Sequence, residues 1–265
     1  MFGVIRLVAA FIIATLLLSP LQASIINTFD NPGDVILSPT QAPGTWYVDR
    51  YPPAGFAAGQ IGGGRTGVLH HFISANDASN LRPPSFSTAF YNTQGRKFDL
   101  PSGTTAMGIE LYVPSDWANL NQNVLGAEGR LGSFWGTAVD SFNTISFYPI
   151  IEYNNQAGFR VWNNGVWINV PGFTGYDKWY DLAIEIDGAN FNYYINSALV
   201  ATVNALGSTQ LSNVILQGYN AGNSYNIYWD NLRNSTFIPE PTTLALFGLM
   251  GTAALSYRVR RRFRS

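Results

Sequence analysis

Residues 24–238 are predicted to fold as an all-β sandwich. Short apolar runs, separated by Gly, Asn, Asp and Pro, fill this part of the chain, and no long helical pattern interrupts them. Aromatic residues make up 14% of the whole chain, which also has 26 Gly. Such a composition favours strands and turns over helices. The length, about 215 residues, suits one large all-β domain.

The first half of this domain is predicted to contain brief strands in Pro- and Gly-rich loops. Strand-like runs are separated by turn sequences such as Asn31-Pro32-Gly33, and residues 115–120 are expected to form one helical turn. The expected strands are residues 25–30, 46–49, 66–73, 88–91, 105–113, 132–139 and 144–153.

The second half has the clearest strand register. Residues 159–162 and 166–170 flank Asn163-Asn164-Gly165, a turn suited to positive φ, which predicts a β-hairpin. A meander of three strands is expected next, followed by two last strands. Many short strands with no long helix are typical of a sandwich. These strands are residues 179–186, 191–195, 199–203, 214–219 and 224–233.

Residues 162–202 resemble the laminin-G and concanavalin-A-like group of jelly rolls. The features that carry the resemblance are Gly165-Val166-Trp167, Lys178 to Leu182, Asp187-Gly188 and Tyr193 to Asn196. The resemblance implies consecutive strands of one packed sheet. Asn196-Ser197 departs from the Asn-Gly or Asp-Gly usual in that group, and Ser is less comfortable than Gly at positive φ.

The amino-terminal end is predicted to be a signal peptide, residues 1–23. Arg6 precedes the uncharged apolar run Leu7 to Leu18, and the chain then turns polar. Ala23 is a small residue suited to the position before the cleavage site. We therefore expect Ser24 to be the first residue of the mature protein.

The carboxyl-terminal end, residues 239–265, combines three features in order. Pro239-Glu240-Pro241 disfavours helix and predicts an extended, accessible segment. Residues 242–257 hold no charge and predict a single transmembrane helix about 24 Å long. The arginines that follow are expected to stay in the cytoplasm, which leaves the preceding chain across the membrane. These arginines are Arg258, Arg260, Arg261, Arg262 and Arg264.

This tail resembles the PEP-CTERM sorting signal of Gram-negative bacteria that make exopolysaccharide. The same tail is also labelled an ice-binding protein C-terminal domain, a label that implies no ice binding. The resemblance implies that an intramembrane exosortase recognises Pro239-Glu240-Pro241, cuts there and passes the protein from the inner membrane to the cell surface. A plain membrane anchor is the alternative.

Charge and cysteine content exclude several classes of function. Fifteen of the 16 acidic residues but only nine of the 15 basic residues lie in residues 24–238, a net charge of −6. Because the nine are scattered, nucleic-acid binding is not expected. The chain has no cysteine, which excludes disulfides, a thiol nucleophile and Cys-ligated zinc.

Catalytic residues are not evident. Glu185 and Asp187 share one face of a predicted strand, as do the carboxylates of jelly-roll endoglucanases, but the third carboxylate of that motif is missing. Asp187-Gly188 is instead predicted to be a hairpin turn. His70 and His71 are expected to face opposite sides of their strand, so they cannot jointly bind a metal there.

A structural calcium ion is the candidate cofactor. Asp30-Asn31 and Asp230-Asn231 lie in the first and last predicted strands. In many carbohydrate-binding jelly rolls these strands are neighbours, and calcium needs six to eight oxygen ligands. The alternative is that Asp30 and Asp230 only cap strand ends.

Aromatic side chains are the candidates for carbohydrate binding. An exposed row of rings on a sheet would stack against sugars, and the candidate members are Trp135, Trp162, Trp167 and Tyr219. Most aromatic residues of a sandwich belong to its core, to which we assign Trp179 and Trp229.

Together these observations predict an exported, surface-sorted β-sandwich of the exopolysaccharide or envelope matrix. Its expected role is carbohydrate binding without catalysis. A jelly-roll polysaccharide hydrolase or lyase and a purely structural matrix protein are the alternatives. The expected partners are an exosortase-type enzyme, the inner membrane and a polysaccharide.

Overall fold

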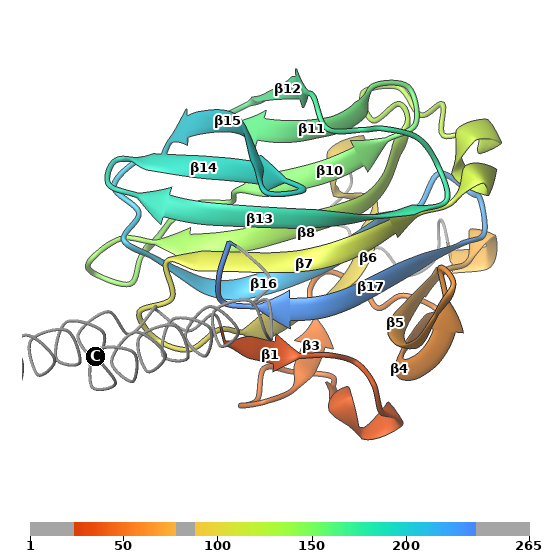
Figure 1. The fold of residues 1–265 in the computed structure, drawn as a ribbon, viewed down its shortest axis with the longest axis horizontal. Helices are drawn as coiled ribbons and strands as arrows, with labels where there is room; N and C mark the ends of the chain where they lie inside the picture. Colours follow the sequence, from red (N-terminus) through yellow and green to blue (C-terminus); the bar gives the residue numbers. More distant parts are fainter. Residues whose placement is uncertain (1–23, 78–87, 237–265) are drawn as a thin grey trace, which may run out of the picture. The chain divides into compact units, whose positions relative to one another are not determined.

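The computed structural model describes residues 24–77 and 88–236. The predicted signal peptide, Pro239-Glu240-Pro241 and the predicted transmembrane helix lie outside these residues, and so do the tail arginines. In the described ranges, no helix is long and apolar enough to span a membrane. Two stacked β-sheets form a sandwich, so the prediction of an all-β fold is confirmed (Figure 1).

The first sheet has eight strands in the order β15-β14-β13-β7-β17-β5-β4, with β1 paired to β17. Every pairing in it is antiparallel. Its strands are β1 (Ile25–Asn27), β4 (Gly55–Gly62), β5 (Arg65–Ile73), β7 (Ala106–Val113), β13 (Lys178–Asp187), β14 (Asn190–Ile195), β15 (Ala198–Asn204) and β17 (Tyr225–Arg233).

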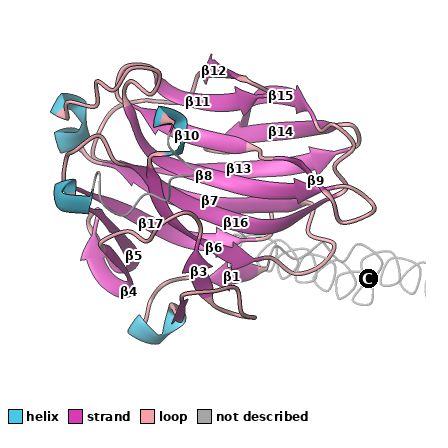
Figure 2. Cartoon of the chain, turned by 180° about the vertical axis from the view of Figure 1, so that it is seen from behind, coloured by secondary structure: helices cyan, strands magenta, loops and turns pink. Residues whose placement is uncertain are grey.

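The second sheet has nine strands in the order β12-β11-β10-β8-β16-β6-β3-β2, with β9 paired to β8 (Figure 2). Only the short β2–β3 pair is parallel among these strands. The strands are β2 (Leu37–Ser38), β3 (Trp46–Val48), β6 (Thr93–Asp99), β8 (Arg130–Val139), β9 (Ile145–Phe147), β10 (Ile150–Asn154), β11 (Gly158–Asn163), β12 (Val166–Val170) and β16 (Gln210–Tyr219).

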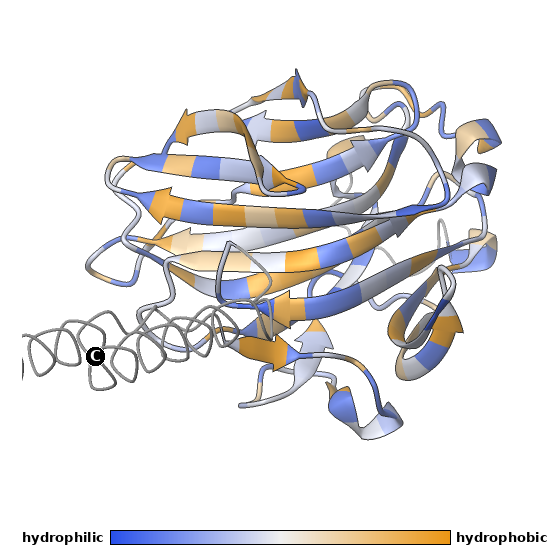
Figure 3. Cartoon of the chain, viewed as in Figure 1, coloured by the Kyte–Doolittle hydropathy of each residue, from blue (hydrophilic) through white to orange (hydrophobic). Residues whose placement is uncertain are grey.

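The core lies between the two sheets and follows from alternation along the strands. In β7, Met107, Ile109 and Leu111 are fully buried in the core, whereas Glu110 and Tyr112 point to the other side of the sheet. Figure 3 shows the same interspersion of hydrophobic and hydrophilic residues along most strands. Trp229 is a core residue as predicted, but Trp179 is only partly buried, because it lies on the outer side of β13 beside Tyr112.

The predicted hairpins are confirmed. β11 and β12 are joined through Asn164 and Gly165, which have φ of 40° and 104°. Gly188, with φ of 59°, lies in the turn between β13 and β14, as Asp187-Gly188 predicts. Asn196 and Ser197 join β14 to β15 with φ of 49° and 65°, so Ser197 adopts a conformation that favours glycine.

Other local predictions need correction. Ala89–Tyr91 forms a 3-10 helix, η4, rather than a strand, while the helical turn predicted at residues 115–120 is present as η5 (Ser115–Asn119). β2, β4 and β6 were not predicted, and residues 144–153, expected as one strand, form the two strands β9 and β10, so that the described residues form 17 strands. The sequence of β4, GFAAGQIG, has few β-branched residues, so its pairing with β5 and not its intrinsic propensity decides its structure.

Candidate binding site on the outer face of the nine-stranded sheet

The four predicted sugar-stacking residues lie on the same side of the nine-stranded sheet, the side turned away from the core. We call this side the outer face. Trp135 is a register partner of Ile150 and Ile215, and these three form an apolar cluster separate from the core. Trp162 pairs with Trp167 across β11 and β12, and both pack against this cluster.

The four rings differ in burial. Trp135 is 2% exposed and Tyr219 is 0% exposed, whereas Trp162 and Trp167 are only partly buried. The Trp162 and Trp167 ring centroids are 5.0 Å apart in an edge-to-face arrangement. Only this last pair therefore presents ring surface to solvent, and sugar stacking by the set stays a prediction.

Phe90, on η4, covers part of this aromatic surface. Its ring centroid lies 6.0 Å from that of Trp135, 5.1 Å from that of Trp162 and 6.3 Å from that of Trp167. All ten residues of β8 are buried because they are covered on both sides of the sheet. The sequence pattern did not indicate this contact, since residues 88–91 read as a strand.

A buried charge network lies beside the aromatic residues. Glu152 is fully buried, and its Oε2 accepts hydrogen bonds from Arg130 Nε and Ser133 Oγ, both at 2.8 Å. Its Oε1 accepts bonds from Arg160 Nε at 3.0 Å and Nη2 at 2.7 Å. Two guanidinium groups thus compensate one buried carboxylate, which would be costly to bury unpaired.

A second carboxylate on this face is paired in the same way. Asp49 contacts Arg50 Nη1 and Lys97 Nζ, each at 2.7 Å, and it also accepts a hydrogen bond from Gln217 Nε2. Gln217 is the register partner of Ser133, so this group lies beside the Glu152 network on the neighbouring strand.

Sequence reasoning missed this network, although one signal was available. Glu152 and Arg160 lie opposite each other in the β10–β11 hairpin, whose turn contains Asn155, Gln156 and Ala157. Such a turn between two apolar runs predicts cross-strand pairs. The pairing of Arg130 with Glu152 instead depends on β8 meeting β10.

The carboxylates considered for hydrolysis lie elsewhere. Glu185 and Asp187 belong to β13 of the eight-stranded sheet, where Glu185 accepts a hydrogen bond from Tyr194 Oη at 2.9 Å. On the outer face of the nine-stranded sheet, Glu152 and Asp49 are both bonded to cations. A glycosidase needs one carboxylic acid that can donate a proton, and neither ion-paired group is arranged for that role.

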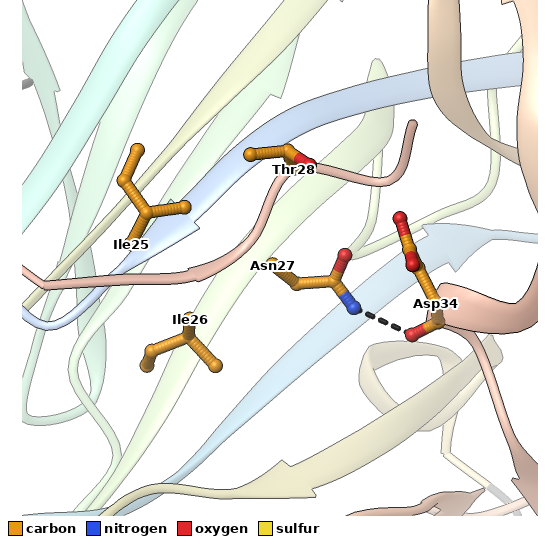
Figure 4. Close-up of a pocket in the computed structure, with 5 residues that line it drawn as sticks. All are labelled: Ile25, Ile26, Asn27, Thr28 and Asp34. Carbon is orange, nitrogen blue, oxygen red and sulfur yellow. Dashed lines mark hydrogen bonds between the residues drawn. The ribbon is translucent and has the colours of Figure 1, made fainter. Parts of the chain in front are cut away.

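A shallow surface pocket of about 360 Å³ lies at the first strand, away from these groups. Figure 4 shows its lining residues, and Asn27 Nδ2 donates a hydrogen bond to the Asp34 carbonyl oxygen at 2.6 Å. The lining residues are Ile25, Ile26, Asn27, Thr28 and Asp34. With no aromatic ring and one carboxylate, the pocket offers little for sugar recognition.

The first and last described strands are neighbours, as the calcium hypothesis requires, because β1 pairs with β17. However, Asp230 Oδ2 contacts Arg65 Nη1 at 2.7 Å, and Asn231 Nδ2 donates to Glu110 Oε2 at 2.6 Å. Burial raises the pKa of Asp230 even though Arg65 acts against it. Asp30 is exposed beside Gly67. Within the described ranges no three His, Cys, Asp or Glu side chains are grouped to hold a metal ion, and calcium binding stays a prediction.

His70 and His71 lie on opposite sides of β5, as expected. His70 stacks on Tyr228 at the outer side of the eight-stranded sheet. His71 is fully buried, with Nε2 3.1 Å from the Gln94 carbonyl oxygen and Nδ1 3.4 Å from Trp229 Nε1. Because an indole N–H can only donate, Nδ1 accepts and Nε2 carries the proton. Burial lowers the pKa of His71 to about 3, so the imidazole is neutral at pH 7.

Comparison with known proteins identifies the carboxyl-terminal signal. Residues 237–262 match the family model of the PEP-CTERM protein-sorting motif, which confirms the resemblance found in the sequence. A search of the curated proteins gives no match.

Several solved structures are similar in strand arrangement. Bacillus licheniformis β-glucanase has 13% identity and a TM-score of 0.46, covering 80% of this chain and 96% of that one. An endo-β-galactosidase from Clostridium perfringens that releases GlcNAcα1-4Gal has 12% identity and a TM-score of 0.49, covering 80% of this chain and 62% of that one. The carbohydrate-binding module CBM66 from Bacillus subtilis has 13% identity and a TM-score of 0.32, covering 52% of this chain and 80% of that one. All three scores lie below 0.5, and at these identities the likeness concerns the fold alone.

An all-β sandwich with a carboxyl-terminal sorting motif defines the class of protein. It is an exported protein that is transiently anchored in the membrane. The particular signal it carries is a PEP-CTERM motif, and processing by an exosortase, a membrane enzyme, follows from that motif.

Proposed function

We propose that the protein is a surface-sorted carbohydrate-binding module of the exopolysaccharide or envelope matrix. In this proposal residues 24–238 face the periplasm while the precursor is anchored. Exosortase processing at Pro239-Glu240-Pro241 then passes the module to the cell surface.

The observation that carries the proposal is the position of the predicted aromatic residues. Trp135, Trp162 and Trp167 come from three different strands of one sheet and share its outer face. Trp162 and Trp167 keep exposed ring surface beside hydrogen-bonding side chains such as Arg160. Aromatic rings beside polar groups complement a sugar, because a sugar ring has apolar faces and hydroxyl groups along its edge.

Binding is favoured over hydrolysis because both carboxylates at the centre of this face are bonded to cations. Glu152 contacts Arg130 and Arg160, and Asp49 contacts Arg50 and Lys97. The two carboxylates hold these basic side chains in fixed positions, which suits a preorganised binding surface. A hydrolase or lyase would instead need an acid or base free to exchange a proton.

The test is retention on insoluble polysaccharides, with and without a calcium chelator. The full chain, purified in detergent, is incubated with cellulose, chitin, starch and the host exopolysaccharide. Trp167→Ala is expected to weaken retention on the bound polysaccharide about tenfold, equivalent to about 1.4 kcal/mol. The matched control is Trp179→Ala, a partly buried tryptophan on the outer side of the other sheet, which should leave retention unchanged.

The outcomes separate the three functional classes. Retention that Trp167→Ala weakens and Trp179→Ala leaves unchanged supports the binding module, and a loss of retention with the chelator would add the calcium ion to it. Release of new reducing ends from a retained polysaccharide would support the hydrolase. Failure of every polysaccharide to retain the protein would leave only a structural role.

A further inference from the structure

We infer that the outer face of the nine-stranded sheet selects anionic glycans, whose sugars carry carboxylate or sulfate groups. This inference rests on the proposed function, because it names the chemical class that the same face would bind. It is carried by the charges, the unpaired hydrogen-bond donors and the ring contacts of the described residues.

Positive charge is in excess on this face. Two groups of bonded side chains, one around Glu152 and one around Asp49, contain two carboxylates and four cations. Ser133 of the first group and Gln217 of the second are register partners on β8 and β16. The four cations are Arg50, Lys97, Arg130 and Arg160. By contrast, residues 24–238 as a whole carry a net charge of −6. Four of the nine basic residues of an acidic domain are thus gathered on one side of one sheet.

A third carboxylate on this face, Asp99 at the end of β6, does not cancel the excess. It accepts hydrogen bonds from two neutral donors, Tyr47 Oη at 2.7 Å and Gln41 Nε2 at 2.8 Å. Counting Asp99 with the side chains around Glu152 and Asp49 still leaves one positive charge. The exposed carboxylate of Glu128, before β8, lies within electrostatic reach of Arg160 but forms no ion pair with it among the described residues.

Hydrogen-bond donors are left over beside the buried charges. Arg130 is 0% exposed, and its Nη2 has no hydrogen-bond partner among the described residues; the same holds for Trp135 Nε1, in a side chain 2% exposed. Gln217 Oε1, a buried acceptor, is also unpaired in the described part of the chain. Buried polar groups normally find partners, so an incoming carboxylate or sulfate with neighbouring hydroxyls matches what is missing.

Aromatic rings hold the arginines in the geometry that suits an anion. The Arg130 guanidinium carbon lies 4.8 Å from the Phe90 ring centroid and 5.0 Å from that of Tyr219. The Arg160 guanidinium carbon lies 4.3 Å from the ring centroid of Trp167. Stacking on a ring leaves the planar edge of a guanidinium group available for hydrogen bonds. Glu152 takes Nε and Nη2 of Arg160 and Nε of Arg130, so Nη2 of Arg130 is the buried donor left over for a carboxylate or sulfate. A sugar on Trp167 therefore brings an acidic substituent close to Arg160.

Phe90 at present makes both kinds of contact that such a ligand would make. Its ring lies over the three tryptophans, and its carbonyl oxygen accepts a hydrogen bond from Arg130 Nη1 at 2.7 Å. A glycan that reaches Arg130 would replace this ring with a sugar and this carbonyl with an anionic oxygen. The Phe90 ring thus occupies the position proposed for a sugar ring, and its carbonyl oxygen occupies the position proposed for an anionic oxygen.

The experiment compares glycans that differ only in charge. The full chain in detergent is titrated calorimetrically with polygalacturonate, with its fully methyl-esterified form, with dextran sulfate and with dextran. Polygalacturonate or dextran sulfate is expected to bind at least about tenfold more tightly than its neutral counterpart, and added salt should weaken that binding. Which anionic polymer binds more tightly identifies carboxylate or sulfate as the recognised group.

Two lysines provide matched variants. Lys97 has a side chain 24% exposed on the outer face, whereas Lys178 is exposed on the other sheet. Lys97→Gln should weaken binding of the anionic polymer about fivefold, the size expected for one screened charge, and Lys178→Gln should not change it. Arg160→Gln serves as a second variant if Lys97→Gln fails to fold.

The results distinguish the two levels of the proposal. Equal affinity for charged and neutral forms, or an equal loss in the two lysine variants, would overturn anion selectivity and leave carbohydrate binding standing. If none of these four polymers binds while a neutral polysaccharide is retained in the pull-down, selectivity is again overturned. If no glycan binds in either experiment, both proposals fail.

Discussion

Individual side chains in this protein are placed by alternation along strands, and adjacent residues can therefore have opposite environments. His70 and His71 are the clearest case, since one stacks on Tyr228 at an outer side and the other lies in the core. Glu152 shows the same alternation, because its neighbours Ile151 and Tyr153 lie in the core while Glu152 faces the other side of the sheet. There Arg130 and Arg160 balance the charge of this buried carboxylate.

The buried His71 predicts a specific dependence of stability on acid. Its pKa is about 3 in the folded protein and about 6.5 in the unfolded chain, so between these values the unfolded chain binds one more proton. Stability should fall as the pH drops below about 6.5, with a slope of about 1.4 kcal/mol per pH unit from this residue. Urea unfolding of the parent and of His71→Leu at pH 7.5 and pH 5 measures this contribution.

His71→Leu should lose about 2 kcal/mol less than the parent over this pH interval, even if it is less stable at both values. His70→Gln, at the neighbouring position on the other side of β5, should keep the acid sensitivity of the parent. The same pH dependence in His71→Leu and the parent would show that His71 does not cause it.

At the scale of elements, the hairpins are encoded by their turn residues and the remaining strands by their neighbours. Asn164-Gly165 and Gly188 provide positive φ where β11–β12 and β13–β14 turn, and both hairpins could be predicted. β4 and β6 lack such a signal and form because β5, β16 and β3 pair with them. η4 lies outside both sheets, although its sequence resembles a strand.

The turn between β14 and β15 is predicted to carry strain at one residue. Ser197 has φ of 65°, a conformation that costs an L-residue about 1–2 kcal/mol. Ser197→Gly removes this cost, partly offset by the greater entropy of glycine in the unfolded chain, for a net gain of about 0.5–1 kcal/mol. The midpoint of urea unfolding should rise accordingly.

Ser141, in the loop between β8 and β9, provides the comparison, because its φ is not positive. Ser141→Gly should have no stabilising effect. If Ser197→Gly is less stable than the parent, the side chain of Ser197 contributes more than its backbone conformation costs.

For the whole molecule, the described core is contained in a single compact unit, Ser24–Phe237. Its buried core draws on both sheets, from Phe29 near the start to Leu232 near the end. We therefore expect this fragment, expressed without residues 1–23 and 238–265, to unfold in one cooperative transition. Calorimetry checks this expectation, and two separate transitions, or no transition, would contradict it.

The sequence by itself determined the all-β class, several hairpins and the sorting motif at residues 237–262. These three features depend on residues that are adjacent in the chain. Turn residues predict the hairpins, apolar runs predict the strands, and the Pro-Glu-Pro, apolar and arginine-rich segments predict the sorting motif. The tertiary structure decided which distant residues meet. Asp49 contacts Gln217, 168 residues away, and Arg130 contacts Phe90, because these contacts depend on strand order and on how loops cover a sheet. Local patterns do not contain that information, since many strand orders satisfy the same alternation of residues.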